Sequence, residues 1–313
     1  MHEFEWIDVL KEALGGGLSA PEGIGDDGGL LPERARVVVT DTMVEGVHFD
    51  RRWSSFEDVA WKLYASNVSD VLAMGAEPRE WLLNVALPDD APARDPKPWV
   101  QGFLAARDAW GGGALVGGDT TRSLRDVVVT VTFFGELLAE PWLRSAFRPG
   151  QRLWIDGPLG ASAAGLYALQ TGHLDGAQAL VEQHRRPVAP ANAPPAQGIT
   201  GGMDISDGLV ADLMHAAKAS AVRMVLTSLP GREPLENYAS SLPLSARERA
   251  TLVDAWQLAG GEDYVRVVSA DESPGRTWRQ IGYVEAGEPS VWDAREGAMS
   301  PLKNLGFDHF RER

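Results

Sequence analysis

The chain has 313 residues, of which 44% are hydrophobic, so it can bury a large core, and at this length two domains are expected rather than one. The net charge of -15 argues against a nucleic-acid partner, because phosphates are bound by Lys and Arg. The chain contains no Cys, which excludes disulfides, thiolate zinc sites and cysteine nucleophiles. The excess of acids suits a protein that binds divalent cations, and it equally suits one that is only kept soluble by them.

The first residues do not have the pattern of a targeting segment. Residues 1–8 are acidic and lack the basic start and apolar core of a signal peptide. No apolar run approaches the length needed to span a bilayer, so we expect a soluble, cytoplasmic protein with no membrane partner. Apolar residues at helical spacing between Phe4 and Leu14 predict a short helix.

A glycine-rich loop over residues 23–29 carries the adjacent acids Asp26 and Asp27. Glycines allow tight backbone turns, and adjacent carboxylates repel each other unless a cation lies between them. An exposed acidic turn explains this loop equally well.

The run over residues 37–42 begins as a β-branched strand and reaches Asp41 between two threonines. Because open α/β sheets bind ligands beyond the carboxyl ends of their strands, we expect Asp41 at a strand end, where it could bind a cation. The alternative is a plain turn, since Asp and Thr also end strands by capping the backbone.

A helix is expected next, from the capping-box pair Ser54 and Glu57 to about Met74, with Gly75 ending it. Asp70 lies on this helix among apolar residues. Acids seldom occupy such a position without a partner, so Asp70 is either a ligand or a solvated edge, and we favour the ligand.

The same pattern of a strand, an acid and threonines then recurs. Strands are expected over 81–87 and 127–134, with a helix over 99–110 between them. A short strand over 114–116 runs into a glycine pair followed by Asp119 and two threonines.

A domain boundary is expected between Leu138 and Gly150. Arg144 lies at this domain boundary, where it is either solvated or able to reach a phosphate from a cleft between the domains.

The second half restarts with a strand over 153–155, and the glycines of residues 157–160 open a helix. Another helix follows Asp204 and Asp207, so both acids also suit helix capping. A last strand is expected over 264–268.

Acids beside Gly, Ser or Thr therefore recur along the chain, at Asp27, Asp41, Asp70, Asp119, Asp204 and Asp207. Oxygen ligands without Cys and with little His favour Mg²⁺, Mn²⁺ or Ca²⁺ over Zn²⁺ or Cu²⁺. Magnesium usually shares carboxylates with substrate phosphates, and phosphoryl transfer needs such ions because its reacting groups are anionic. The Walker lysine loop and the protein-kinase motifs are absent, so another phosphate-binding scaffold is expected.

Several short motifs accompany these acids in a fixed order: residues 23–27 (GIGDD), 40–42 (TDT), 45–49 (EGVHF), 67–70 (NVSD), 117–122 (GGDTTR), 204–209 (DISDGL), 260–264 (GGEDY) and 306–310 (GFDHF). In this order they resemble the motifs of thiamine-monophosphate kinases. Each motif alone is weak, but the ordered set extends over nearly the whole chain and is highly specific.

The resemblance implies an α/β (α+β) fold of the two-domain, aminoimidazole ribonucleotide synthetase-like type. It implies an ATP- and magnesium-binding dimerisation domain over 1–140 and a C-terminal α/β domain over 149–313. The N-terminal sheet is expected to pair across a homodimer, with ATP bound between the protomers. The implied reaction is direct in-line transfer of the ATP γ-phosphate to thiamine monophosphate, giving thiamine diphosphate and ADP. Several Mg²⁺ ions are expected to assist, with no phosphoenzyme.

Roles for individual residues follow from the same resemblance. Magnesium roles fall to Asp27, Thr40, Asp41, Asp70, Asp119, Asp204 and Asp207. Nucleotide contacts fall to Gly118, Asp119, Arg144 and Ser206. Contacts to thiamine monophosphate fall to His48, Glu262 and Phe307. No general base is expected, because the acceptor is already a phosphate anion and Asp41, Asp119 and Asp207 can act through magnesium to neutralise charge.

Two alternatives remain. One is another ATP-dependent enzyme of the same superfamily, such as an aminoimidazole ribonucleotide synthetase or a selenophosphate synthetase. Selenophosphate synthetases often use a reactive Cys or selenocysteine near the N-terminus, whereas this chain has no Cys. The other is a protein that binds magnesium and nucleotide without catalysis.

Overall fold

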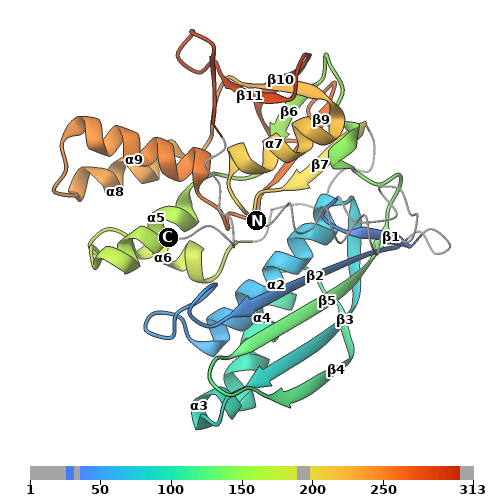
Figure 1. Cartoon of the computed structure of the whole chain (residues 1–313), viewed down its shortest axis with the longest axis vertical. Helices are drawn as coiled ribbons and strands as arrows, with labels where there is room; N and C mark the ends of the chain where they lie inside the picture. Colours follow the sequence, from blue (N-terminus) through green and yellow to red (C-terminus); the bar gives the residue numbers. More distant parts are fainter. Residues whose placement is uncertain (1–25, 32–35, 189–197, 304–313) are drawn as a thin grey trace.

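The computed structural model describes residues 26–31, 36–188 and 198–303. The helix expected between Phe4 and Leu14, and Phe307, lie outside these described residues. Two sheets, one from each half of the chain, are placed one above the other in Figure 1. This mixed α/β architecture confirms the expected fold class. Among the described helices, none is long and apolar enough to cross a membrane.

The N-terminal sheet has five strands in the order β1-β2-β5-β3-β4. The strands are β1 (Gly29–Leu31), β2 (Arg36–Val44), β3 (Ala76–Leu87), β4 (Ala114–Arg122) and β5 (Val128–Leu137). Strands β3 and β4 are parallel, and the other neighbours are antiparallel. All nine residues of β4 are exposed, so this edge strand is uncovered within the described part of the chain.

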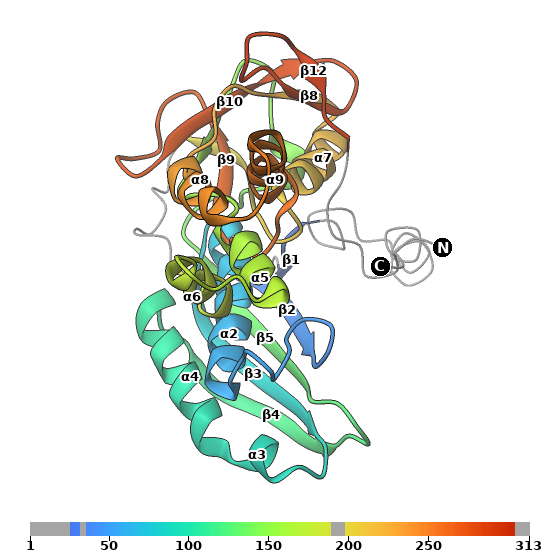
Figure 2. The ribbon, with the colours of Figure 1, turned by 90° about the vertical axis from the view of Figure 1, so that its left-hand side faces the viewer.

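Helices α2 (Phe56–Ala73) and α4 (Pro96–Trp110) cover one face of this sheet, and the short α3 (Ala91–Arg94) precedes α4 (Figure 2). The capping box that opens α2 is one residue later than expected. Ser55 Oγ accepts from the Asp58 backbone N–H at 3.2 Å, and the Asp58 carboxylate accepts from the Ser55 N–H at 3.0 Å. The helix ends as predicted, with Gly75 in the left-handed region at φ 75°.

The expectation that Asp41 ends a strand is wrong, since β2 continues to Val44. The flanking threonines continue the pairing of β2 with β5 and do not end the strand. Thr40 and Thr42 pair their hydroxyls with those of Thr132 and Thr130 on β5, at 2.9 and 2.8 Å. Such cross-strand pairs stabilise a sheet. Because side chains alternate along a strand, Asp41 lies on the opposite face from these threonines, which is the face that packs on α2.

The C-terminal sheet has seven strands in the order β12-β11-β8-β10-β6-β9-β7. The strands are β6 (Arg152–Ile155), β7 (Ile199–Asp204), β8 (Val222–Leu226), β9 (Arg266–Ala270), β10 (Arg279–Ala286), β11 (Ser290–Asp293) and β12 (Ser300–Pro301). The helices of this half are α5 (Ala161–Thr171), α6 (Gln178–Arg185), α7 (Leu209–Ser220), α8 (Arg232–Ser241) and α9 (Ala246–Ala259). A short 3₁₀ turn, η2 (Arg144–Ala146), joins the two halves.

Each sheet has its own buried core. In the N-terminal half, Tyr64 of α2 meets Trp81 and Phe133 edge to face, with ring centroids 5.7 and 5.0 Å apart. In the C-terminal half, α7 packs its leucines on strands β7 to β9. Tyr264 follows β7 and β8 in sequence but packs in the N-terminal core. The two halves are therefore in direct contact through α2, and this contact positions the site described next.

Candidate functional site

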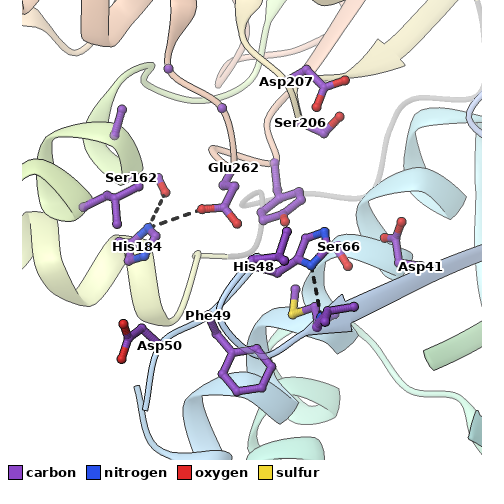
Figure 3. A pocket seen from close by; sticks show the side chains of 18 of the residues that line it. Asp41, His48, Phe49, Asp50, Ser66, Ser162, His184, Ser206, Asp207 and Glu262 are labelled. Carbon is purple, nitrogen blue, oxygen red and sulfur yellow. Dashed lines mark hydrogen bonds and ion pairs between the residues drawn. The ribbon is translucent and has the colours of Figure 1, made fainter. Parts of the chain in front are cut away.

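A cavity of about 1130 Å³ lies where the two halves meet. Its walls come from β2 and the following loop, from α2 and α5, and from the loop over 259–262 (Figure 3). Both halves thus contribute polar side chains to one space, which is large enough for phosphorylated small molecules.

Three carboxylates from distant parts of the chain converge beside this cavity. Asp27 comes from the loop before β1, Asp70 from α2, and Asp204 from the end of β7. One oxygen of each lies within 4.8 Å of the others. The sequence predicted all three as magnesium ligands, and the structure brings them together.

The electrostatics of this cluster favour a cation. Burial, and then the neighbouring carboxylates, raise the pKa of Asp70 and Asp204 well above the usual range. Burial also raises the pKa of Asp27, although Arg144 opposes that effect. Asp27 Oδ2 and Asp204 Oδ1 are buried without a hydrogen-bond partner. Buried carboxylate oxygens without a partner are costly, and a hard cation with oxygen ligands relieves that cost. The donor set therefore fits Mg²⁺.

Asp41 and Thr40 lie next to this cluster on β2, and both line the cavity. Burial raises the pKa of Asp41, while a hydrogen bond from the Ser66 side chain of α2 opposes the shift. Asp27 contributes repulsion to Asp41, so the two acids share one electrostatic environment.

Arg144 reaches the cluster from η2. Its guanidinium contacts the Asp27 carboxylate, and its backbone N–H donates to Asp26 Oδ1 at 2.5 Å. Burial alone would lower the pKa of Arg144, but Asp27 and other nearby acids raise it, so the side chain stays charged. A fixed guanidinium beside a cation site is well placed to contact a phosphate.

Ser206 and Asp207 line the cavity in the turn before α7. The expectation that Asp204 or Asp207 caps this helix is wrong, because the N-cap residue is Gly208, without a side-chain cap. Asp212 instead accepts the backbone N–H groups of Ser206, Asp207 and Gly208 on one oxygen, at 3.1 Å each. The sequence analysis missed Asp212. Its only signal was an acid in the first turn of a helix, where it complements the helix dipole.

His48 and Glu262 also line the cavity, and in Figure 3 they lie between His184 and Asp41. His48 Nδ1 accepts from the Val44 backbone N–H at 3.0 Å, which fixes the ring. His184 of α6 also lines the cavity and was not predicted.

Gly118 and Asp119 do not line the cavity. The strand register places Asp119 in one row with Asn84, Thr130 and Thr42. Three strand spacings separate Asp119 from Thr42, about 14 Å at the usual distance between strands. The row also puts Asp119 on the sheet face opposite to Asp41. Within one chain, Asp119 is therefore remote from the acid cluster.

Comparison with known proteins identifies relatives over the whole chain. Residues 25–137 match the family described as AIR synthase related protein, N-terminal domain. Thiamine-monophosphate kinase of Mycobacterium tuberculosis is 35% identical over 295 residues, which is 92% of this chain and 86% of the relative. Thiamine-monophosphate kinase of Bacillus subtilis is 29% identical over 336 residues, covering 99% of this chain and 100% of the relative.

Solved structures agree with these sequence relatives. The structure of AaThiL complexed with AMPPCP and TMP matches with a TM-score of 0.83 at 29% identity, covering 99% of this chain and 97% of that chain. Hydrogenase maturation protein HypE in complex with ATP matches with a TM-score of 0.64 at 20% identity, covering 86% of this chain and 85% of that chain, which is a similarity of fold alone.

Proposed function

The chain belongs to the thiamine-monophosphate kinase family, and we propose that it passes the γ-phosphate of ATP directly to thiamine monophosphate, in line and with several Mg²⁺ ions. The products are thiamine diphosphate and ADP. The observation that carries this proposal is the convergence of Asp27, Asp70 and Asp204 beside a cavity that both halves of the chain line.

Magnesium would be bound by these three acids, with Asp41, Thr40 and Asp207 as further oxygen ligands around the cavity. Bound there, the ions supply positive charge between two anionic phosphates, which otherwise repel each other at about 4 kcal/mol per close charge pair near an effective dielectric of 20. Ser69 and Ser66 hold the ligand carboxylates Asp204 and Asp41 in place.

The chain's own cation in this region is Arg144. Its guanidinium sits against Asp27 and can bind a phosphate oxygen of the nucleotide. Ser206, whose N–H is held by Asp212, lines the cavity, whereas Arg144 does not line it and contacts the acid cluster beside it. We assign to both residues the nucleotide contacts that the family resemblance implies.

No side chain is required as a general base. The accepting oxygen of thiamine monophosphate is already anionic, so alignment of the two substrates and neutralisation of charge suffice. His48, with Nδ1 bonded to the backbone of Val44, orients the acceptor. Glu262 contacts the thiamine portion from the opposite wall.

We also propose a homodimer in which β4 supplies Gly118 and Asp119 to the partner's site. The support is the uncovered edge strand, where Leu115 and Val116 are 54% and 59% exposed. Long exposed edge strands with apolar side chains are normally covered by a partner. Asp119 is too far from the acid cluster of its own chain to act there, so only a second copy gives it the expected role.

A product assay tests the reaction. Purified protein is mixed with Mg-ATP and either thiamine monophosphate or free thiamine, and ADP and thiamine diphosphate are quantified. We expect turnover of the monophosphate, and a fall of at least about a hundredfold for Asp70→Asn, the range seen when a charge-stabilising group is lost. Asp175→Asn, at an exposed site remote from the cavity, is the matched control. Turnover of free thiamine alone would overturn the assignment of the acceptor.

The in-line geometry has its own test. With ATP made chiral at the γ-phosphorus, a single direct transfer inverts the configuration. Net retention would show two successive transfers and therefore a phosphoenzyme.

A further inference from the structure

A buried lysine of the N-terminal half is paired with a cavity residue of the C-terminal half. Lys62 of α2 places Nζ 2.7 Å from Glu262 Oε2, and its side chain is only 5% exposed. A buried ammonium is costly without a partner, so this pair is a constraint and not a chance surface contact. Lys62 itself does not line the cavity, whereas Glu262 does.

A histidine contacts the same carboxylate oxygen from the other side. His184 Nδ1 lies 3.4 Å from Glu262 Oε2 and 3.1 Å from Ser162 Oγ (Figure 3). Burial, and then the charge of Lys62, lower the pKa of His184 to about 3, so the ring is neutral near pH 7. Lys62 therefore balances the charge of Glu262 among the described ion pairs, and His184 adds a neutral polar contact.

The backbone of Glu262 is held as tightly as its side chain. Its φ of 64° lies in the left-handed region, which a non-glycine residue rarely adopts. Its N–H donates to the Ser206 carbonyl at 2.8 Å. A Cβ at the preceding Gly261 would lie 2.2 Å from that carbonyl, so only glycine allows this close contact between the two turns. Such strain persists at functional sites, where the surroundings fix the conformation.

We propose that Lys62 and His184 are positioning residues that hold Glu262 by Oε2 and leave Oε1 as a fixed acceptor facing the thiamine end of thiamine monophosphate. This inference rests on the proposed function. Both contacts go to Oε2, and among the described residues none is recorded to Oε1. Because Lys62 offsets the negative charge, Glu262 selects for a hydrogen-bond donor, such as the amino group of the thiamine pyrimidine, more than for a cation.

The test is steady-state kinetics with each substrate varied in turn. For Lys62→Met we expect the KM for thiamine monophosphate to rise by about tenfold to a hundredfold, the cost of losing a hydrogen bond to a charged group. The KM for ATP should stay within about twofold, because the ion pairs of Lys62 and Glu262 Oε2 do not involve the acid cluster. Lys62→Arg keeps the charge and should recover most of the loss.

A matched control exists at the same contact between the two halves of the chain. Arg186 pairs with Asp58 of α2 at 2.5 Å but does not line or support the cavity. Arg186→Met removes the ion pairs of Arg186 with Asp58 and Glu57 of α2, which join α2 to the end of α6, so it reports the effect of loosening this contact without touching Glu262. We expect it to leave the KM for thiamine monophosphate near the wild-type value.

A double variant separates positioning from folding. If Lys62 acts only through Glu262, then Lys62→Met combined with Glu262→Gln should be no worse than Glu262→Gln alone. Both variants in this comparison lack the Glu262 charge, and the amide oxygen that Glu262→Gln introduces can still accept from Lys62, so the comparison holds even if Lys62→Met alone does not fold.

Additive losses, an equal rise in both KM values, or the same effect from Arg186→Met would overturn the positioning role while the kinase activity stands. A wild-type protein that forms no thiamine diphosphate would instead overturn the proposed function, and the positioning role with it.

Discussion

The hydroxyl of Ser69 on α2 donates to Asp204 Oδ2 at the end of β7, 2.7 Å away, and so joins the two halves of the chain at the acid cluster. Asp204 Oδ1 has no partner, so this bond is the main support of a buried carboxylate. Ser69→Ala should lower the free energy of unfolding by about 1–3 kcal/mol without magnesium, the cost of leaving a buried acceptor unsatisfied. Urea denaturation with and without Mg²⁺ measures it.

The loss should shrink when Mg²⁺ is present, because the ion takes over the support of Asp204. Ser241→Ala removes a hydroxyl bond to the Tyr238 carbonyl at 2.7 Å on α8, far from the cluster, and should cost the same in both conditions. A magnesium-independent loss in Ser69→Ala would contradict our account of the Asp204 environment.

Asp70→Asn should make the metal-free protein more stable. It removes one of three mutually repelling carboxylates whose ligand atoms lie within 4.8 Å. The free energy of unfolding should rise, because a carboxylate whose charged form is destabilised by burial and by its neighbours is replaced by a neutral amide. The same variant should lose the thermal shift that Mg²⁺ gives the wild type. A metal-free melting temperature at or below that of the wild type would show that the acids do not repel one another in the folded protein.

The acid cluster could be predicted from the sequence because its aspartates share a simple pattern. Aspartates recurred within two residues of a Gly, Ser or Thr, and three of them, Asp27, Asp70 and Asp204, do converge. The predicted strand end at Asp41 was wrong, because β2 continues to Val44. The threonines around Asp41 form cross-strand pairs with β5, and no single-strand pattern reveals which partner a strand will find.

The supporting residues could not be predicted for a related reason. Lys62 appears in sequence as an ordinary helical lysine, and only the packing of α2 against the C-terminal half brings it to Glu262. Asp212 has a signal as a first-turn acid, but its three bonds depend on a turn that Gly208 permits with φ 122°. A contact across 200 residues of sequence decides the role of Lys62, whereas the role of Asp212 depends on the conformation of the turn just before its helix.

Asp212→Ala should disturb the nucleotide end of the cavity more than the thiamine end. Three backbone N–H groups, at residues 206–208, would lose their acceptor. We expect the unfolding free energy to fall by about 2–4 kcal/mol, from one to two unsatisfied donors after partial access of water. The KM for ATP should rise more than the KM for thiamine monophosphate. Asp212→Asn keeps one acceptor oxygen and should lie between Ala and wild type; an Asn variant as impaired as Ala would show that charge matters more than the bonds.

His184 should make folding stability depend on pH. Burial lowers its pKa from 6.5 in an unfolded chain to about 3, with Lys62 and Arg185 adding to the shift and Glu262 opposing it. Between these two values only the unfolded chain takes up the proton, so stability falls as the pH drops below about 6.5. At pH 5 the loss from this group should be about 2 kcal/mol, at 1.4 kcal/mol per pKa unit.

His184→Gln keeps a polar contact to Ser162 but cannot titrate. Its unfolding free energy should therefore fall less steeply than that of the wild type between pH 7 and pH 5, when both are measured in the same chelating buffer. Parallel curves would mean that His184 is already protonated in the folded protein, against the burial seen here.

Asp119 provides a test of the proposed dimer that does not depend on measuring its size. On its own chain Asp119 lies about three strand spacings from the β2 row, or about 14 Å, and on the opposite sheet face from Asp41. Asp119→Asn and Asp70→Asn should each abolish turnover. In a two-fold dimer whose sites combine Asp70 of one copy with Asp119 of the other, a mixed dimer has one intact site and one doubly damaged site. Random co-assembly of the two variants should therefore restore about a quarter of the wild-type activity. If each chain used its own Asp119, every site would carry one defect and no activity would return, so the absence of rescue in verified mixed dimers would place Asp119 outside the partner's site.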